Sequence, residues 1–405
     1  MNVYLDHAAT SPMPAEVIEA YVSALAVVGN PSSIHTQGQT AKRMLEEARE
    51  AVAAAVGAEP IEVTFTSGGT EAINLALKGL WWARTSPVIE PVEIHGTVST
   101  GSTVSTGSTT GSRRILSTRA EHHATIDALE WLERHEGAEI EWIPVDSLGR
   151  IDLVALEAAL GPDVALVTTL WSNNEVGTVQ PVAEIVALAA AHGVPVHADA
   201  VSALGQLPID FAASGLAALS ISAHKIGGPV GTGALVTARS TVVEPLLHGG
   251  GQQRFRSGTQ DAAGAHAFGV AAARASSDLA GHAARLTALR DHLIAGIRGS
   301  VPSAVLRGDP SDRLPGNAHF TFPGCEGDSL LYLLDAAGFS VSTGSACQAG
   351  VPEASHVLLA MGLTEPDARG ALRFTLGDST TVEELDALIA ALPAVVSRAR
   401  SAGLA

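Results

Sequence analysis

The sequence is poor in cysteine, in aromatic residues and in basic residues. Its two cysteines, Cys325 and Cys347, could form at most one disulfide, which excludes a disulfide-stapled fold. Lys and Arg number 24 against 42 Asp and Glu, and they form no basic cluster. The formal net charge of -18 argues against direct binding of nucleic acid, because an acidic surface repels a phosphate backbone.

Long apolar runs are also missing. No uninterrupted apolar segment reaches the roughly 18 residues that a membrane-spanning helix needs. The first residues, MNVYLDHAATSP, lack the basic and then apolar pattern of a secretory leader. We therefore expect a cytoplasmic protein with no membrane partner, a setting in which free thiols are more common than disulfides.

The sequence does contain enough apolar material for a large core. Hydrophobic residues make up 46% of the 405 positions, which favours one large domain or two unequal ones. Between about residues 60 and 240, short apolar runs alternate with Ala-, Leu- and Glu-rich segments. This is the pattern of βα units around a mostly parallel sheet. The predicted strands include 61–67, 164–170, 194–200 and 217–223.

Two regions differ from this pattern. After Gly264, long Ala-rich helical segments lead into strands and helices that predict a second, smaller domain. Residues 97–112, TVSTGSTVSTGSTTGS, repeat Ser, Thr and Gly without a hydrophobic period and predict a surface insertion. A phosphate-binding role for these glycines is the weaker alternative, because no strand and helix flank them tightly.

A lysine stands between a predicted buried strand and a glycine-rich turn, in SISAHKIGGPVGTGAL (220–235). Burying an amine is costly, so Lys225 either reaches water or has a lowered pKa and forms a Schiff base with an aldehyde cofactor. From this segment alone, the two interpretations are equally supported.

Two other segments could bind an anion and a ring nitrogen. In TSGGTEAIN (66–74), two glycines follow a strand and Thr70 begins a helix. The first N–H groups of that helix could bind a phosphate, although a ligand-free βα turn has the same sequence pattern. In VHADAVSALG (196–205), Asp199 ends an apolar strand at the sheet edge where open α/β sheets bind ligands. Asp199 could pair with a protonated pyridine nitrogen, or it could merely cap the next helix.

Ten collinear motifs together resemble the pyridoxal-phosphate-dependent class V aminotransferase superfamily and, within it, the NifS-like cysteine desulfurases. They extend over nearly the whole chain: YLDHAATSP (4–12), GNPSSIHTQG (29–38), FTSGGTEAIN (65–74), EHHA (121–124), NNEVGTVQP (173–181), HADA (197–200), SAHK (222–225), GGGQQRFRSGT (249–259), STGSAC (342–347) and RFTLG (373–377).

The resemblance implies an α/β architecture, the fold type I of pyridoxal-phosphate-dependent transferases. Its large domain, expected at 15–262, would contain a mostly parallel seven-stranded sheet flanked by helices. Residues 1–14 and 263–405 would form the smaller α/β domain, which carries the cysteine loop. Family members are homodimers, so we expect this chain to pair with a second copy.

The resemblance also implies roles for individual residues. Lys225 would hold pyridoxal 5'-phosphate, Asp199 would pair with its ring nitrogen, and His122 would stack on the ring. The other implied cofactor contacts are Gly69, Thr70, Asn174, Ser202, Ser222 and His224, with Thr259 reaching the phosphate bound by the partner subunit. Asn174 and Arg373 would hold the substrate carboxylate, for which a guanidinium has a bidentate fork.

One of these positions departs from the family pattern. The family usually has Gln three residues after the strand-end Asp, where it contacts the cofactor's phenolic oxygen, and this chain has Ser202. Serine can donate a hydrogen bond but has a shorter reach, so we expect a bridging water or a different tuning of the cofactor. His7 likewise replaces the usual aromatic residue after LD.

The segment SVSTGSACQAG (340–350) places Cys347 among residues typical of loops. The resemblance implies that its thiolate takes sulfur from L-cysteine as a persulfide, leaving L-alanine, and passes it to an acceptor protein. That acceptor would be a scaffold for iron–sulfur cluster assembly or a tRNA thiolase. Lys225 would move the Cα proton, with His122 as a nearby acid or base.

Two alternatives use the same motifs. Another class V enzyme, such as an aminotransferase or a selenocysteine lyase, would not need the loop thiol. A degenerate, non-enzymatic binding partner is less favoured, because Lys225, Asp199, His122 and Arg373 are all retained. We expect Cys325 to pack as a small apolar residue, and the His122–His123 pair to bind no metal, because it lacks metal-ligand spacing.

Overall fold

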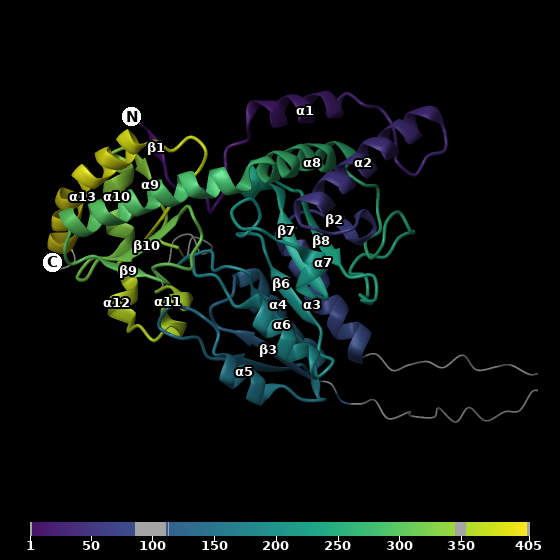
Figure 1. The fold of residues 1–405 in the computed structure, drawn as a ribbon, viewed down its shortest axis with the longest axis horizontal. Coiled ribbons are helices and arrows are strands. Elements are labelled where there is room, and N and C mark those ends of the chain that lie inside the picture. The colour runs from purple at the N-terminus through teal and green to yellow at the C-terminus, as the bar shows by residue number, and fades with distance from the viewer. Residues whose placement is uncertain (1, 86–110, 112, 345–353, 403–405) are drawn as a thin grey trace, which may run out of the picture.

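A seven-stranded sheet forms the centre of the larger part of the molecule (Figure 1). The computed structural model describes residues 2–85, 111, 113–344 and 354–402. The strands lie in the order β2 (Val63–Thr66), β8 (Gly233–Thr237), β7 (Ala218–Ser222), β6 (Val196–Asp199), β5 (Val164–Leu170), β3 (Arg114–Thr118) and β4 (Glu139–Ile143). Only β8 runs antiparallel to its neighbours, so the expected mostly parallel seven-stranded sheet is confirmed.

Helices cover both faces of this sheet. One face packs against α3 (Gly69–Thr85) and α4 (His123–Glu136). The other face packs against α2 (Thr36–Ala55), α5 (Leu153–Ala159), α6 (Val182–Ala190), α7 (Phe211–Ser214) and α8 (Ala262–Ser277). Because both faces are covered, the central strands β5 and β7 are buried along their whole length, as parallel strands between helices are. The helix α1 (Ala15–Leu25) lies on α8.

Short turns connect these elements at the positions that the sequence marks. The single turn η1 (Pro60–Glu62) precedes β2, and η2 (Ala223–Ile226) follows β7 directly. The helix α2 ends just before Gly57, whose φ of 63° is the left-handed conformation that glycine adopts readily. The structure therefore keeps the strand, turn and helix order on which the expected binding site depends.

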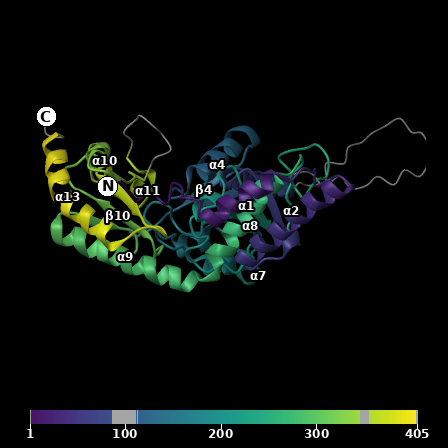
Figure 2. The same cartoon turned by 90° about the horizontal axis from the view of Figure 1, so that it is seen from above.

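The smaller part of the molecule contains two further sheets. Its three-stranded antiparallel sheet has the order β12 (Ala371–Thr375), β10 (Asn317–Thr321) and β9 (Val305–Arg307). The N-terminal strand β1 (Val3–Tyr4) pairs in parallel with β11 (Phe339–Ser340). Its helices are α9 (Leu279–Ser300), α10 (Gly327–Ala336), α11 (His356–Ala360), α12 (Glu365–Arg369) and α13 (Val382–Ala402). Figure 2 shows α9 and α13 at the C-terminal end of the molecule, away from α1 and α2.

The packing of α8 bears on the domain boundary. Ala265, Phe268 and Ala272 of this helix belong to the same buried cluster as the central sheet, whereas α9 packs against α13. We therefore propose that the large domain extends to Asp278, the N-cap of α9, instead of ending at 262. The pairing of β1 with β11 supports assigning residues 1–14 to the small domain.

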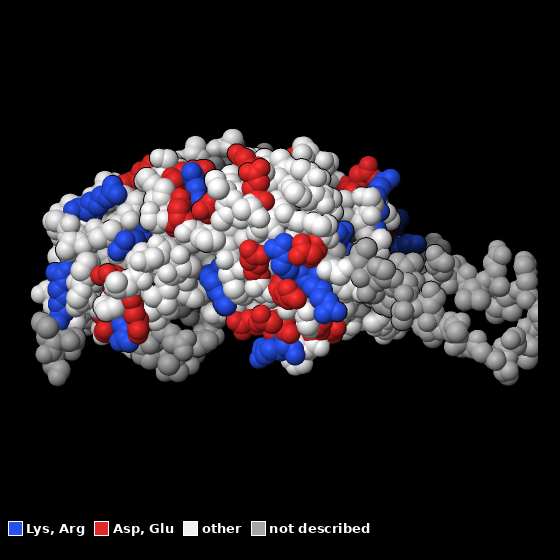
Figure 3. Space-filling view, turned by 90° about the horizontal axis from the view of Figure 1, so that it is seen from below, with Lys and Arg blue, Asp and Glu red and all other residues white. Residues whose placement is uncertain are grey.

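Acidic and basic side chains are interspersed on the face shown in Figure 3. The described ion pairs include a double contact of Arg114, which reaches both Asp163 and Glu141. Paired charges of this kind form ordinary solvated faces and contribute little net stability each. Among the described residues, no helix is both long enough and apolar enough to cross a membrane.

Candidate active site

A cavity of about 350 Å³ lies where the carboxyl ends of several strands meet. Because β8 runs antiparallel to both β2 and β7, the strands β2, β5, β6 and β7 all point their carboxyl ends to this edge. The predicted residues that line the cavity are Gly69, Thr70, His122, Asn174, Asp199, Ser202, Ser222, His224, Lys225 and Arg373. We call it the sheet-edge cavity.

Asp199 is the last residue of β6, and its side chain is 3% exposed. Its Oδ1 accepts a hydrogen bond of 2.9 Å from the Val201 N–H, so it closes a turn and does not cap a helix. Burial raises the pKa of Asp199 to about 6, while the Val201 N–H and the charge of Lys225 oppose that rise. A cation inside the cavity would further favour the ionised carboxylate.

Lys225 lies in η2, the turn that follows β7. Its Nζ donates to the backbone oxygens of Ala8 at 2.5 Å and Ala9 at 3.0 Å. The Ser11 N–H donates to the His224 oxygen at 2.9 Å, which ties the N-terminal segment to the same turn. Sequence reasoning missed these carbonyl acceptors, because a backbone oxygen has no side-chain signature. The motif YLDHAATSP is the one signal that could have directed attention to them.

His122 is the N-cap of α4, where its Nδ1 accepts from the Ala124 N–H at 3.1 Å. Burial, followed by the nearby charge of Lys225, lowers the pKa of His122 to about 4. The ring is therefore neutral near pH 7, and the capping contact assigns its proton to Nε2. A neutral, fixed imidazole beside the cavity can face a flat ring and donate one hydrogen bond.

Arg373 on β12 brings the three-stranded sheet to the cavity. It is 4% exposed, with Nη1 donating to the Asn174 oxygen at 3.0 Å and Nη2 forming an ion pair with Asp6 at 2.9 Å. Its Nε is buried without a hydrogen-bond partner among the described residues. The guanidinium is thus fixed at two nitrogens and keeps a third donor for an anion. Asp6, within the quoted YLDHAATSP motif, is a partner that sequence reasoning did not assign.

Comparisons with known proteins agree with this geometry. The class V aminotransferase family model matches residues 3–109 and 97–388. This chain belongs to the class V aminotransferase family. It is 49% identical over 406 residues to an IscS-like cysteine desulfurase of Mycobacterium tuberculosis, covering 99% of this chain and 98% of that protein.

Two solved structures of this family resemble the fold. A NifS-like protein superimposes with a TM-score of 0.86 and 32% identity, covering 98% of this chain and 100% of that one. A structure described as SspA in complex with cysteine has a TM-score of 0.76 and 30% identity, covering 92% and 98%. The expected fold type I architecture is confirmed.

Class V enzymes use pyridoxal phosphate, and the cavity has the groups to receive it. The Oγ of Ser222 is buried and has no hydrogen-bond partner within the part of the chain that the structure describes, so it can donate a hydrogen bond to a phosphate oxygen. At Gly69, where α3 begins, an added Cβ would lie 2.8 Å from Val201 Cγ2 and 3.5 Å from Ser222 Cβ, so only glycine leaves this corner open. The first N–H groups of the 17-residue helix α3 add a positive potential there.

Ser202 also lines the cavity, and it directly follows Val201, the residue whose N–H donates to Asp199. Thr259 is exposed and does not line the cavity of its own chain. Its loop is attached close to the start of α3, because Arg256 and Glu71 form an ion pair of 3.0 Å. Cys347 lies outside the described residues, as does all of the insertion 97–112 except Gly111.

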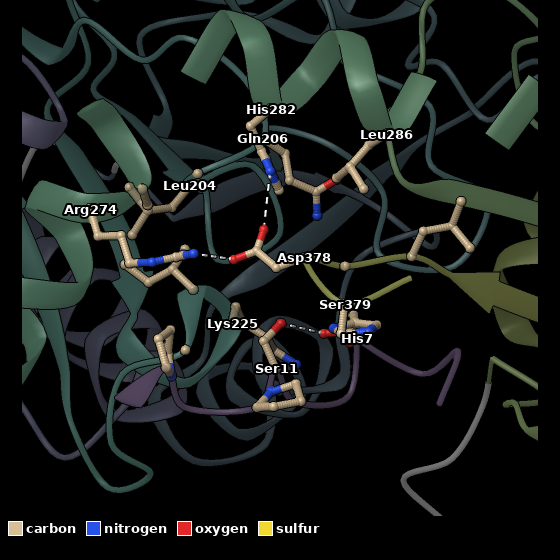
Figure 4. A pocket seen from close by; sticks show the side chains of 18 of the residues that line it. His7, Ser11, Leu204, Gln206, Lys225, Arg274, His282, Leu286, Asp378 and Ser379 are labelled. Atoms are coloured by element: carbon tan, nitrogen blue, oxygen red, sulfur yellow. Dashed lines mark hydrogen bonds and ion pairs between the residues drawn. The ribbon is translucent and has the colours of Figure 1, made fainter. Parts of the chain in front are cut away.

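A larger cavity of about 600 Å³ lies next to the first and is lined by residues of the N-terminal segment, of η2, of α8 and α9 and of the chain that follows β12 (Figure 4). Lys225 lines both cavities. The larger one contains Asp378, which pairs with Arg274 at 2.6 Å and with His282 at 3.2 Å. The ion pair of Arg274 with Asp378 joins α8 to the chain that follows β12, so residues of the larger and the smaller part of the molecule both line this cavity. No group of three His, Cys, Asp or Glu that could hold a metal occurs among the described residues.

Proposed function

We propose that this chain is a pyridoxal-phosphate-dependent cysteine desulfurase, which converts L-cysteine to L-alanine and transfers the sulfur through Cys347. The observation that supports it best is the meeting of Lys225, Asp199, His122 and Arg373 around one cavity. The relative described above as an IscS-like cysteine desulfurase, and the solved structure in complex with cysteine, support the choice of substrate.

Each residue then has a task that follows from its geometry. Bound pyridoxal phosphate supplies an electron sink for bond cleavage at the substrate carbons. Lys225 moves the proton at the substrate Cα, since its Nζ already lies at the edge of the cavity. The neutral His122 holds a proton on Nε2 and faces the same space.

The remaining residues bind and orient. Asp199 supplies a carboxylate for a positively charged ring nitrogen. Arg373 offers Nε to the substrate carboxylate, with Asn174 beside it. Residues of the sheet edge, of β12 and of the N-terminal segment together line the cavity that would receive the substrate.

In the sulfur-transfer step, the Cys347 thiolate is the nucleophile. Its Sγ forms a bond to the substrate sulfur while the substrate Cβ–S bond breaks. The electron pair of that bond stays with the carbon, which takes up a proton and becomes the methyl group of alanine. The persulfide on Cys347 then passes to an acceptor protein, for which we propose an iron–sulfur scaffold or a tRNA thiolase.

We also propose that the enzyme is a homodimer located in the cytoplasm. An exposed apolar row on α1, formed by Ile18, Val22 and Leu25, supports an interface with a second copy. The exposed position of Thr259 supports its contribution to the partner's site. A reactive thiol is best maintained in a reducing compartment, which supports the location.

Absorption spectra test the cofactor assignment. The purified protein should be yellow, with a band near the edge of the visible range that Lys225→Ala abolishes. Cys347→Ser should keep the colour and the spectral response to L-cysteine but lose sulfide release. A colourless wild-type protein, or undiminished sulfide release from Cys347→Ser, would contradict the proposal. A requirement for a keto acid would instead indicate an aminotransferase.

A further inference from the structure

The imidazole of His356, the first residue of α11, contacts the turn that carries His122. Its Nε2 lies 2.8 Å from the backbone oxygen of Glu121, the residue directly before His122. A backbone oxygen can only accept, so Nε2 carries the proton and donates it. The same ring lies beside the ring of His123, with 4.5 Å between the two centroids. His356 therefore contacts the residues on both sides of His122, although it is not among the described residues that line the sheet-edge cavity.

The apolar side of α11 packs against the same turn. Val357 and Leu358 belong to one buried cluster with Ala120, the residue two positions before His122. The hydrogen bond from His356 and this apolar contact thus act on neighbouring residues of the turn, and both come from α11.

The opposite side of the turn is held by the chain at and after the end of β5. The Leu170 N–H donates to the Glu121 carboxyl at 3.1 Å, and Asn173 Nδ2 donates to the Ala120 oxygen at 2.9 Å. Leu170 itself lines the sheet-edge cavity. The turn is therefore held from one side by β5 and the residues after it, and from the other side by His356.

His122 has little freedom of its own once this turn is in place. Its Nδ1 accepts from the Ala124 N–H at 3.1 Å, and its backbone oxygen accepts from the Thr125 N–H at 2.8 Å. Both contacts fix the ring relative to α4, so a shift of the turn would move the ring relative to the cavity. A displacement of about 1 Å in a group that takes part in the reaction is enough to cost about 100-fold in rate.

We propose that His356 is a positioning residue for His122: by donating to the Glu121 oxygen, it holds the turn that places the His122 ring at the wall of the sheet-edge cavity. This inference rests on the role of His122 in the proposed function. His356 touches neither cofactor nor substrate in this assignment, and it acts through the backbone of Glu121.

Two substitutions separate the hydrogen bond from the packing of the ring. His356→Phe keeps a flat ring beside His123 but cannot donate, whereas His356→Gln keeps an amide N–H of similar reach. In the cofactor-loaded enzyme with L-cysteine and a thiol reductant, His356→Phe should lower kcat for alanine formation about tenfold, with KM for cysteine within about twofold of wild type. His356→Gln should recover most of the rate.

Binding of pyridoxal phosphate to the cofactor-free protein gives a readout that does not depend on turnover. His356→Phe should weaken this binding about fivefold, because the His122 ring no longer faces the cofactor correctly. The same change in a His122→Ala background should alter the affinity less than about twofold, because the two residues act through one contact with the cofactor. A general structural role of His356 would weaken binding equally in both backgrounds.

His135→Phe is the matched control. His135 Nδ1 lies 2.9 Å from the Trp131 oxygen in the last turn of α4, so this variant also removes a contact between an imidazole and a backbone oxygen. It should keep the wild-type kcat and the wild-type affinity for pyridoxal phosphate.

Wild-type kcat in His356→Phe would overturn the inference, as would an equal loss of cofactor affinity in the two His122 backgrounds or a His356→Gln variant as slow as His356→Phe. If His356→Phe does not fold, His356→Ala takes its place in the same comparisons.

The proposed function is tested separately. Cofactor affinity that His122→Ala leaves unchanged would overturn this inference together with the assigned role of His122. Undiminished sulfide release from Cys347→Ser would contradict the proposed function instead, whatever the His356 variants do.

Discussion

Two buried carboxyl groups share the space behind the active site, and only one of them can readily be charged. Glu121 is 2% exposed, and its Oε1 accepts from the Leu170 N–H at 3.1 Å and from Thr118 Oγ1 at 3.2 Å. Its Oε2 accepts no hydrogen bond from any described residue. Burial, together with the nearby charge of Asp199, raises the pKa of Glu121 to about 8. Glu121 is therefore protonated near pH 7, which leaves the negative charge to Asp199.

The first prediction concerns the pH dependence of Glu121. Its folded pKa lies above the unfolded value, so its stabilising contribution is complete below about pH 4.5 and is lost as the pH rises through about 8. Glu121→Gln cannot titrate and should not show this loss. Urea unfolding of the cofactor-free proteins measures this effect. Between about pH 5 and pH 9, the free energy of unfolding of wild type should fall by on the order of 3 kcal/mol relative to that of Glu121→Gln. Parallel stability profiles would refute a protonated Glu121.

A second prediction at this scale concerns Ser222. Its buried Oγ has no hydrogen-bond partner among the described residues, so Ser222→Ala should leave the stability of the cofactor-free protein unchanged or slightly higher. The same change should weaken pyridoxal phosphate binding about tenfold, because one phosphate hydrogen bond is lost. Equilibrium titration of each cofactor-free protein with pyridoxal phosphate measures this affinity. Ser117→Ala, another buried unpartnered serine that does not line the cavity, is the control and should bind normally.

At the scale of elements, the strands of the central sheet were the most predictable feature. The segment 164–170 is a strand over its full predicted length, and the predicted strands 194–200 and 217–223 contain β6 and β7, which end at Asp199 and Ser222. Periodicity and burial report on these positions directly. The backbone carbonyls that hold Lys225 could not be predicted in this way, since they belong to a segment more than 200 residues away whose side chains are alanines.

The close approach of β8 to the turn before α3 gives a prediction for an element. A Cβ on Gly233 would lie 2.6 Å from the backbone carbon of Gly68 and 2.8 Å from the Ile221 oxygen, and neither backbone can yield easily. Gly233→Ala should therefore destabilise the protein by about 1 to 3 kcal/mol. Gly299→Ala in α9, where a Cβ meets nothing within 4 Å, should be neutral or stabilising. Equal midpoints in chemical unfolding for both variants would show that β8 tolerates the added methyl group.

At the scale of the whole molecule, the apolar row on α1 would be exposed to water in a monomer, which is unfavourable. Val22 and Leu25 are each 62% exposed, and Val28 and Ile34, on the chain that follows, are 81% and 91% exposed. Contiguous apolar surface of this kind marks an interaction site. A second copy of this chain is the partner proposed above.

Light scattering after size-exclusion chromatography tests this interface. Wild type should have twice the mass of one chain, and Val22→Asp should shift the protein toward monomer, because a charge in an apolar contact must be desolvated. Val154→Asp, at a 77% exposed position on α5, is the matched control and should remain dimeric. A wild-type monomer, or an unchanged mass for Val22→Asp, would contradict an interface on α1.

The central claim is that sulfur passes from the substrate to Cys347. Its most direct test is incubation of the cofactor-loaded enzyme with L-cysteine, without reductant, followed by mass measurement of the peptide that contains Cys347. We predict that this peptide gains one sulfur atom and that the peptide containing the buried Cys325 does not. Alanine formed in full amount with no added sulfur on Cys347 would contradict the account.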